Sequence, residues 1–370
     1  MKSGFTTGSC SAAAAKAAVY MLLSGKEKNQ IEIITPKGIT FHADILEITR
    51  SENKVKCGVK KNAGDDPDIT HGSIIFAEAS YGDGADSRVI IDGGEGVGRV
   101  TKPGLDQPVG NAAINHVPRE MITREVLEIC RLFDCSREIS IIISVPGGEL
   151  LAEQTFNPRL GIIGGISIIG TSGVVEPMSE QALLDTIYLE MSQKRALGQE
   201  IIAVSPGNYG LDFMNDTFNY DLEKSVKCSN FIGETLDMAG ELGFKGMLFT
   251  GHIGKLIKVS LGIMNTHSKY GDHRMEAIAL AIDERCLKSE KIDEIKADIM
   301  EAATTEEAVR ILADAGIRDR VMSRIMDKII MHMRARIDGK YRIECMMYSN
   351  QHGMLAETGR AREMLAELER

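Results

Sequence analysis

The segment from residue 251 to residue 274, GHIGKLIKVSLGIMNTHSKYGDHR, concentrates side chains that can handle protons or hold anions. It contains three of the eight histidines of the chain together with lysines and an arginine, although the whole chain carries a formal charge of −10. Imidazole titrates near neutral pH, so His252, in a loop after an expected strand, is the first candidate catalytic residue. Helix capping or ion pairing is the structural alternative for all three histidines, and their spacing fits no compact zinc motif.

A second polar segment, KNAGDDPDITHG at residues 61–72, lies between two expected strands. Its carboxylates suggest a metal site. However, Pro67 stiffens the loop and no bidentate acid follows at the spacing of a calcium loop, so we predict no bound metal. Two interpretations remain open. The segment is either a turn rich in side-chain-to-backbone hydrogen bonds or a polar clamp, in which Lys61 binds substrate carboxylates and Asp65 and Asp66 act as candidate catalytic residues.

Two further segments are candidate binding loops for an acidic ligand. Thr6, Thr7 and Ser9 precede an alanine-rich helix, whose free amide donors and positive end favour a carboxylate or phosphate; simple helix capping is the alternative. Residues 92–104, DGGEGVGRVTKPG, fail as a dinucleotide-binding fingerprint because the glycine spacing is wrong and no helix follows. The bare backbone would let a flat ligand approach, with Arg99 and Lys102 at its acidic rim, unless the segment is only a mobile loop.

The elements that must position these residues change character near residue 150. Before it, short strand-like runs alternate with glycine-rich loops and two helices, which predicts an α+β domain over residues 1–154. After it, apolar strands alternate with helical periodicity, which predicts parallel βαβ units in a three-layer α/β domain over residues 155–370. We place the boundary within residues 153–158, where Asn157-Pro158 favours a loop.

Three loops of the second part follow expected strands at residues 162–169, 200–205 and 246–250. Ligands of open α/β sheets bind beyond the carboxyl ends of the strands, so we expect these loops to form one binding site. Its candidate residues are Gly170, Thr171, Gly173, Pro206, Gly207, Asn208 and Gly251.

Composition limits the classes of partner. The net charge of −10 argues against nucleic acid, whose phosphates need clustered basic residues, but it does not exclude a small anionic substrate. No run of about 18 apolar residues predicts a membrane span. Seven scattered cysteines, an odd number, favour reduced thiols in a cytoplasmic protein. The sequence leaves the oligomeric state open.

The N-terminal run GFTTGSCSAAAAKAA at residues 4–18, the segment 61–72 and the run 251–274 together closely resemble one family. It is the family of cobalt-precorrin-5B C-1 methyltransferases of the anaerobic cobalamin pathway. The resemblance implies an α+β substrate-binding domain followed by a Rossmann-like domain that holds S-adenosylmethionine. It further implies methylation of C-1 of cobalt-precorrin-5B, a cobalt-containing tetrapyrrole, to give cobalt-precorrin-6A. The cobalt arrives inside the substrate.

Two other functions remain as alternatives. A nicotinamide-dependent tetrapyrrole reductase would use the same α/β domain, but the absence of G-x-G-x-x-G weakens it. A tetrapyrrole carrier would bind its ligand without turnover, and stoichiometric rather than catalytic product formation would reveal it. The chain also departs from the commonest methyltransferase pattern, because Ser205 stands where an acid usually follows the second strand.

Overall fold

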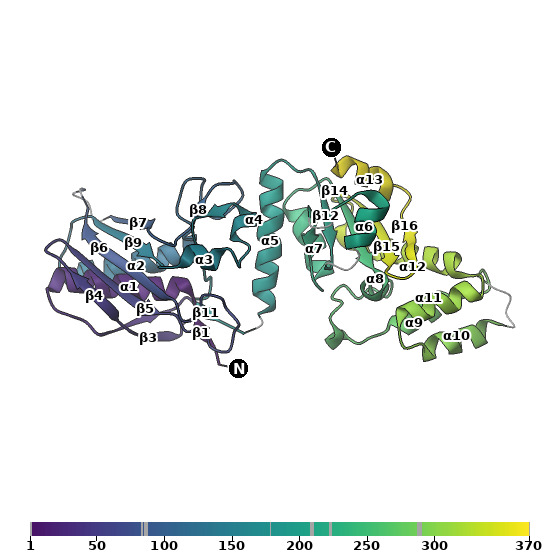
Figure 1. Ribbon diagram of the computed structural model, residues 1–370, viewed down its shortest axis with the longest axis horizontal. Helices are drawn as coiled ribbons and strands as arrows, with labels where there is room; N and C mark the ends of the chain where they lie inside the picture. The colour runs from purple at the N-terminus through teal and green to yellow at the C-terminus, as the bar shows by residue number, and fades with distance from the viewer. Residues whose placement is uncertain are drawn as a thin grey trace. The chain divides into compact units, whose positions relative to one another are not determined.

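The computed structural model of the chain describes residues 2–82, 84, 88–177, 179–207, 211–221, 224–286 and 291–369, without the side chains of residues 211–213. The chain divides into two compact units, Met1–Ala182 and Leu183–Arg370. Figure 1 labels the helices and strands of both. Both units mix helices and strands, as predicted.

The first unit is built on a five-stranded sheet and two helices that pack together. The sheet has the order β4 (Leu46–Arg50), β5 (Lys54–Lys60), β6 (Ile74–Tyr81), β9 (Ile139–Ser144) and β7 (Val89–Gly93). Its pairs are antiparallel except β7 with β9. Helix α1 (Thr7–Ser24) contacts β5, β6 and helix α2 (His116–Leu132). A separate hairpin joins β2 (Gln30–Ile34) and β3 (Thr40–Asp44).

Helix α1 is buried along most of its length because its side chains are small. Every residue from Thr7 to Val19 is buried, including the alanines at residues 12–15 and 17–18. Alanine is the strongest helix former and adds little bulk, so the helix can lie close to both the sheet and α2. The apolar side chains of strands β5, β6 and β9 complete this core.

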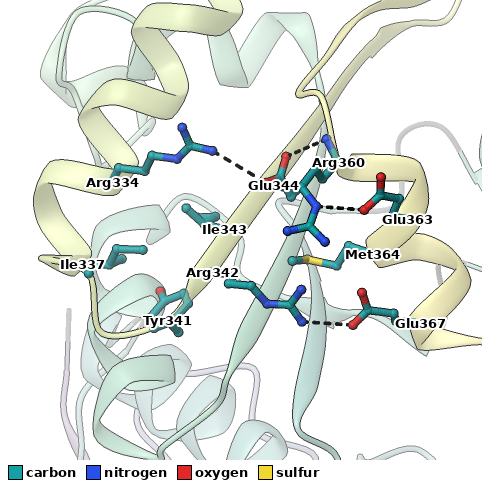
Figure 2. Close-up of a pocket in the computed structure, with 11 residues that line it drawn as sticks. Arg334, Ile337, Tyr341, Arg342, Ile343, Glu344, Arg360, Glu363, Met364 and Glu367 are labelled. Atoms are coloured by element: carbon teal, nitrogen blue, oxygen red, sulfur yellow. Dashed lines mark hydrogen bonds and ion pairs between the residues drawn. The ribbon is translucent and has the colours of Figure 1, made fainter.

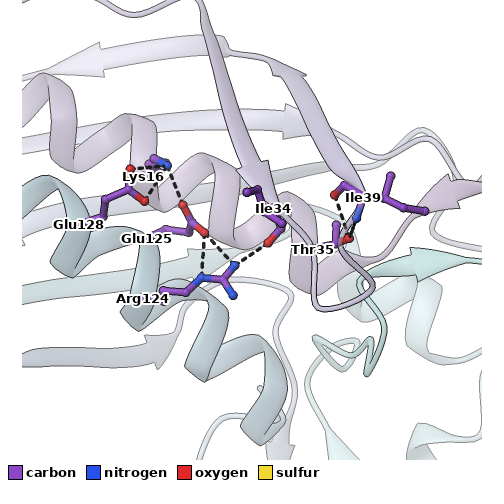
Figure 3. A network of polar contacts seen from close by, with 7 residues as sticks. All are labelled: Lys16, Ile34, Thr35, Ile39, Arg124, Glu125 and Glu128. Atoms are coloured by element: carbon purple, nitrogen blue, oxygen red, sulfur yellow. Dashed lines mark hydrogen bonds and ion pairs between the residues drawn. The ribbon is translucent and has the colours of Figure 1, made fainter.

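One charged side chain interrupts the alanine run and ties the two helices together (Figure 3). The Lys16 ammonium lies 2.7 Å from Glu125 and 3.1 Å from Glu128, both on α2. Burial opposes the charge of Lys16, but the two carboxylates outweigh it and raise the pKa of this lysine. Arg124 extends the network, donating to Glu125 and to the carbonyl oxygen of Ile34 at the end of β2.

The segment after residue 155 belongs to the first unit, so the predicted boundary at residues 153–158 differs from the observed division. Strand β10 (Ile162–Ile163) pairs with β8 (Arg99–Val100), and β11 (Val174–Val175) pairs with β1 (Gly4–Phe5). The predicted strand at residues 162–169 is wrong, because Gly164 takes a left-handed φ of 82° and interrupts it. Two short helices, α3 (Gly148–Ala152) and α4 (Asn157–Leu160), lie before β10.

The second unit contains a mainly parallel sheet with helices on both faces (Figure 1). Its strand order is β13 (Val226–Lys227), β12 (Ile201–Ser205), β14 (Gly246–His252), β15 (Arg342–Ser349) and β16 (Gly353–Glu357). Only β16 runs antiparallel to its neighbour. The strands predicted at residues 200–205 and 246–250 are confirmed as β12 and β14.

Strand β14 lies in the middle of this sheet and is buried on both faces, which explains its continuous apolar sequence. Met247 and Phe249 pack into the cluster formed with α7 (Ile232–Glu241), α8 (Ile253–Val259) and α12 (Arg318–Ile337). Leu248 points to the other face, where it meets α13 (Ala361–Leu368) and α6 (Leu211–Phe218). The remaining helices are α5 (Glu180–Ala196), α9 (Arg274–Ala279), α10 (Ile292–Glu301) and α11 (Thr305–Asp314).

Candidate functional site

A cavity of about 370 Å³ lies beyond the carboxyl ends of β12, β14 and β15 in the second unit. We call it the strand-end cavity. Its wall is formed by the residues after β12 (Pro206, Gly207), those around the end of β14 (His252, Gly254, Lys255), those at the end of β15 (Tyr348, Asn350, Gln351), and Arg274, Thr305 and Glu306. In the sheet, β12 lies between β13 and β14, the two strands that follow it in the chain, so the order of the strands reverses at β12. Open α/β sheets bind ligands at such a reversal.

His252 is held in this wall by both of its ring nitrogens. Nδ1 accepts a hydrogen bond from the Gly254 amide at 3.1 Å, which caps α8. Because Nδ1 is an acceptor, the neutral ring carries its proton on Nε2, which lies 3.1 Å from Glu306. Both side chains are mostly buried, with 20% and 16% of their surfaces exposed.

Glu306 joins His252 to the end of β15. One carboxylate oxygen faces His252, and the other accepts a hydrogen bond from the Ser349 hydroxyl at 2.6 Å. The same hydroxyl accepts the amide of His352 at 3.0 Å, and the His352 ring lies 3.2 Å from the Glu306 carbonyl oxygen. The first turn of α11 therefore fixes the ends of β14 and β15 relative to each other.

Lys255 reaches the strand-end cavity from α8, the helix that His252 caps. Its ammonium donates to the carbonyl oxygens of Pro206 at 3.2 Å and Ser229 at 3.3 Å. Burial lowers the pKa of Lys255 below its ordinary value. One turn later, buried Lys258 donates to the carbonyls of Gly271 at 2.6 Å and Thr266 at 3.3 Å, which ties down the loop that leads to α9.

The other two histidines of the 251–274 run have structural roles at the surface. The His267 ring accepts the Lys269 amide at 3.1 Å and caps a short 3₁₀ helix. His273 lies 2.7 Å from Glu276 and precedes α9. Only His252 of the three borders the strand-end cavity.

The residues predicted to bind a cofactor are divided between the two units. Pro206 and Gly207 line the strand-end cavity. Gly251 is buried, and an added Cβ there would come within 2.9 Å of the Leu256 side chain. Asn208 lies outside the described residues. The predicted loop of Gly170, Thr171 and Gly173 lies in the first unit, so the expectation that it follows a strand of the parallel sheet is wrong.

That loop packs against the N-terminal hydroxyl motif. Ser9 donates to the Gly173 carbonyl at 2.6 Å, and Thr7 both donates to and accepts from the backbone of Ile169. Thr6 caps α1 by accepting the Ser9 amide at 3.2 Å, and all three hydroxyl residues are buried. The structure therefore uses Thr6, Thr7 and Ser9 for capping and for attaching the loop, and their hydroxyls already have protein partners.

Lys61 is a buried member of an ion pair. Its side chain is 1% exposed, and its ammonium contacts Asp68, which also accepts the Thr70 amide and hydroxyl. Burial opposes ionisation of Asp68, but the charge of Lys61 and these hydrogen bonds prevail and lower the pKa of this carboxyl. Asp65 is exposed and accepts the Lys2 amide, and Asp66 is half-buried. Sequence reasoning treated Asp68 only as one of the carboxylates of this segment and did not predict its pair with Lys61, although an acid two residues before a threonine is a signal for such a turn.

The glycine-rich segment at residues 93–98 lies against the backbone of its own unit. A Cβ on Gly96 would come 1.8 Å from the carbonyl oxygen of Val145, and one on Gly165 would come 2.3 Å from the backbone of Gly96. The close approach that these glycines permit is thus between protein segments, contrary to the expectation of a flat ligand. Arg99 forms a bidentate pair with Asp92 at 2.7 and 2.9 Å, and exposed Lys102 donates to the Arg159 carbonyl.

A second cavity, of about 320 Å³, lies at the start of β15 between α12 and α13 (Figure 2). Its three arginines all face glutamates: Arg342 lies 3.0 Å from Glu367, Arg360 lies 2.8 Å from Glu363, and Arg334 lies 3.6 Å from Glu344. These cations are already compensated, so this cavity lacks the free positive charge that an anionic ligand needs.

Among the described residues, no group of three or more histidine, cysteine or acidic side chains has the arrangement of a metal site. Within the same part of the chain, no helix combines the length and the apolar character needed to cross a membrane.

Comparisons with known proteins give a consistent family. The family model described as CbiD matches residues 1–177, and the model described as CbiD, C-terminal domain, matches residues 265–359. A protein of Ruminiclostridium cellulolyticum named cobalt-precorrin-5B C(1)-methyltransferase is 44% identical, over 100% of this chain and 95% of its own length. A protein of the same name from Thermoanaerobacter sp. is also 44% identical, over 97% and 96%.

Among solved structures, the crystal structure of the cobalamin biosynthesis protein cbiD from Archaeoglobus fulgidus is 27% identical. The match covers 74% of this chain and 84% of that one, with a TM-score of 0.38. The identities to the curated relatives extend over both units of the chain. The chain therefore belongs to the CbiD family, whose relatives named here are cobalt-precorrin-5B C(1)-methyltransferases.

Proposed function

We propose that this protein is an S-adenosylmethionine-dependent methyltransferase that methylates C-1 of cobalt-precorrin-5B to give cobalt-precorrin-6A. The observation that carries the proposal is the 44% identity to a protein of that name over the whole chain. That name favours catalysis over the alternatives of a nicotinamide-dependent reductase and a carrier without turnover. The cobalt belongs to the substrate.

The second unit is the proposed Rossmann-like cofactor domain, and the strand-end cavity is the proposed cofactor site. Ligand cavities of proteins commonly measure about 300–1,000 Å³, and this one measures about 370 Å³. Its donor set fits S-adenosylmethionine: Lys255 suits a carboxylate, and Asn350 and Gln351 suit the hydroxyls and ring nitrogens of adenosine. Among the described residues, nothing lies within 4 Å of the position where Gly207 would carry a Cβ, so this part of the structure leaves the backbone there open to a ligand. When bound, S-adenosylmethionine supplies an electrophilic methyl group.

The protein's own contribution is proposed to be mainly orientation. A ring carbon made electron-rich by its pyrrole nitrogen needs no strong base, and correct alignment of two reactants can be worth about 7–11 kcal/mol. His252 and Glu306 together hold the ends of β14 and β15, so we assign His252 a positioning role. Asp65 and Asp66 remain the candidates for a proton-handling group.

The first unit is the proposed substrate domain. Arg99 and Lys102 are exposed and can exchange their present partners for carboxylates of the macrocycle. Buried Lys61 supports the fold of the 61–72 segment through Asp68, and Thr6, Thr7 and Ser9 support the loop at residues 169–173. These residues are proposed to shape the substrate surface from beneath.

The function is tested by incubating the protein with cobalt-precorrin-5B and S-adenosylmethionine labelled in its methyl group. We expect one labelled methyl group per product molecule, with many turnovers per protein. Label transfer that stops at one equivalent of protein, or product that forms only with a nicotinamide cofactor, would reject the proposal in favour of a carrier or a reductase.

The location of the cofactor is tested with two matched glycine variants. Gly207 and Gly359 both have open space at the Cβ position, but only Gly207 lines the strand-end cavity. Gly207→Val should weaken S-adenosylhomocysteine binding at least about tenfold, equivalent to about 1.4 kcal/mol, because the new side chain occupies ligand space. Calorimetry on Gly359→Val should give the wild-type affinity. If both variants bound S-adenosylhomocysteine with the wild-type affinity, the cofactor would have to bind elsewhere.

A further inference from the structure

Lys255 differs from Arg274, the other cation of the strand-end cavity, in the groups that its charge contacts. Its ammonium donates hydrogen bonds to two backbone carbonyl oxygens, those of Pro206 and Ser229. No carboxylate among the described residues lies within ion-pair distance of its ammonium. Arg274, the other cation of the wall, forms a pair with Asp272 at 2.8 Å. Glu306, the acid of the wall, is already occupied by His252 and Ser349.

This arrangement leaves a half-buried positive charge without a counter-charge. Removing a charge from water is costly unless an opposite charge compensates it. Burial accordingly lowers the pKa of Lys255. The arginines of the second cavity show the opposite situation, since each of them faces a glutamate (Figure 2). A ligand that brought an anionic group to Lys255 would supply the missing charge.

We propose that Lys255 binds a carboxylate of the ligand that occupies the strand-end cavity. The inference rests on the proposed function and adds to it the anchoring group of the site. Two ligands of a tetrapyrrole methyltransferase carry carboxylates: S-adenosylmethionine, in its amino-acid part, and the macrocycle, on its ring substituents. The two backbone carbonyls hold the ammonium in place, and the remaining N–H is directed at the ligand carboxylate.

The test compares two ligands that differ by the amino-acid part. S-Adenosylhomocysteine carries the carboxylate, whereas 5′-methylthioadenosine retains the adenosine and the thioether without it. Lys255→Met removes the charge and keeps much of the side-chain length. It should weaken S-adenosylhomocysteine binding by about ten- to a hundredfold, as expected for a lost charge-assisted hydrogen bond, and leave 5′-methylthioadenosine binding unchanged.

The affinities for both ligands are measured by calorimetry, and two further variants complete the series. Lys255→Arg keeps the charge and should retain most of the affinity for S-adenosylhomocysteine. Lys245→Met serves as the matched control, since Lys245 is a surface lysine paired with Glu200, and it should bind both ligands like the wild type. If Lys255→Met does not fold, as judged by circular dichroism, Lys255→Gln takes its place.

The outcomes distinguish the two possible sources of the carboxylate, S-adenosylmethionine and the macrocycle. They also distinguish a failure of this inference from a failure of the proposed function. Unchanged nucleoside binding with a ten- to a hundredfold loss of cobalt-precorrin-5B binding would support the inference with the macrocycle as the source of the carboxylate. Unchanged binding of both S-adenosylhomocysteine and cobalt-precorrin-5B to Lys255→Met would overturn the inference and leave the proposed function standing. A wild-type protein that binds neither S-adenosylhomocysteine nor cobalt-precorrin-5B would overturn both.

Discussion

Asp68→Asn should destabilise the first unit by about 3–5 kcal/mol, because it leaves the ammonium of Lys61 buried without a counter-charge. Chemical denaturation followed by circular dichroism measures the loss. Asp65→Asn is the matched control, since this acid belongs to the same segment but is exposed; it should change the free energy of unfolding by no more than about 0.5 kcal/mol. Equal, small effects of the two substitutions would show that Lys61 is not committed to Asp68.

The Lys61–Asp68 pair allows two further tests, one with a double variant and one of how the stability depends on pH. Replacing both partners by apolar residues, Lys61→Met with Asp68→Leu, should recover most of the stability, because no buried charge then remains. The pKa of Asp68 is lowered from its ordinary value of 3.8. The stability that ionised Asp68 contributes is therefore complete above pH 3.8 and is lost as the pH falls through the lower pKa of the folded state. The free energies of unfolding of the wild type and Asp68→Asn should therefore converge in acid.

His252→Ala should slow single-turnover methylation by about a hundredfold, the effect of a misplacement of about 1 Å in an aligned site. Glu306→Ala should give a similar loss, since the His252 ring and the Glu306 carboxylate hold each other in place. Because the two residues act as one unit, the double variant should be no slower than either single variant. Rapid-quench measurements at saturating ligands supply these rates, and His267→Ala, a surface residue of the same run, is the control.

The dependence of the rate on pH separates positioning from proton transfer. If His252 only positions the wall of the cavity, the pH profile of the wild type should keep its shape in His252→Ala at a lower rate. A limb of the profile that disappears in this variant, together with multiplicative losses in the double variant, would make His252 an acid or base. A rate within a fewfold of wild type would direct attention to Asp65 and Asp66.

The sequence by itself determined the parts of the fold that depend on local pattern. Apolar runs bounded by turns predict strands β12 and β14, and the intervening periodicity predicts that helices alternate with them. The sequence pattern places His252 in a loop just after a strand that ends at residue 250, and the structure makes it the last residue of β14 and the cap of α8. The alanine-rich N-terminal helix is likewise predicted from its composition.

Only the tertiary structure decided which side chains meet and which remain available to a ligand. Lys61 looks like a surface clamp until the fold buries it against Asp68. Gly170 looks like part of a strand-end loop until it packs on Thr6, which lies far from it in the chain. Glu306 belongs to an ordinary helix start, and its importance arises because the fold brings it to His252, 54 residues away. Burial and charge compensation depend on neighbours from remote segments, and a local pattern carries no information about them.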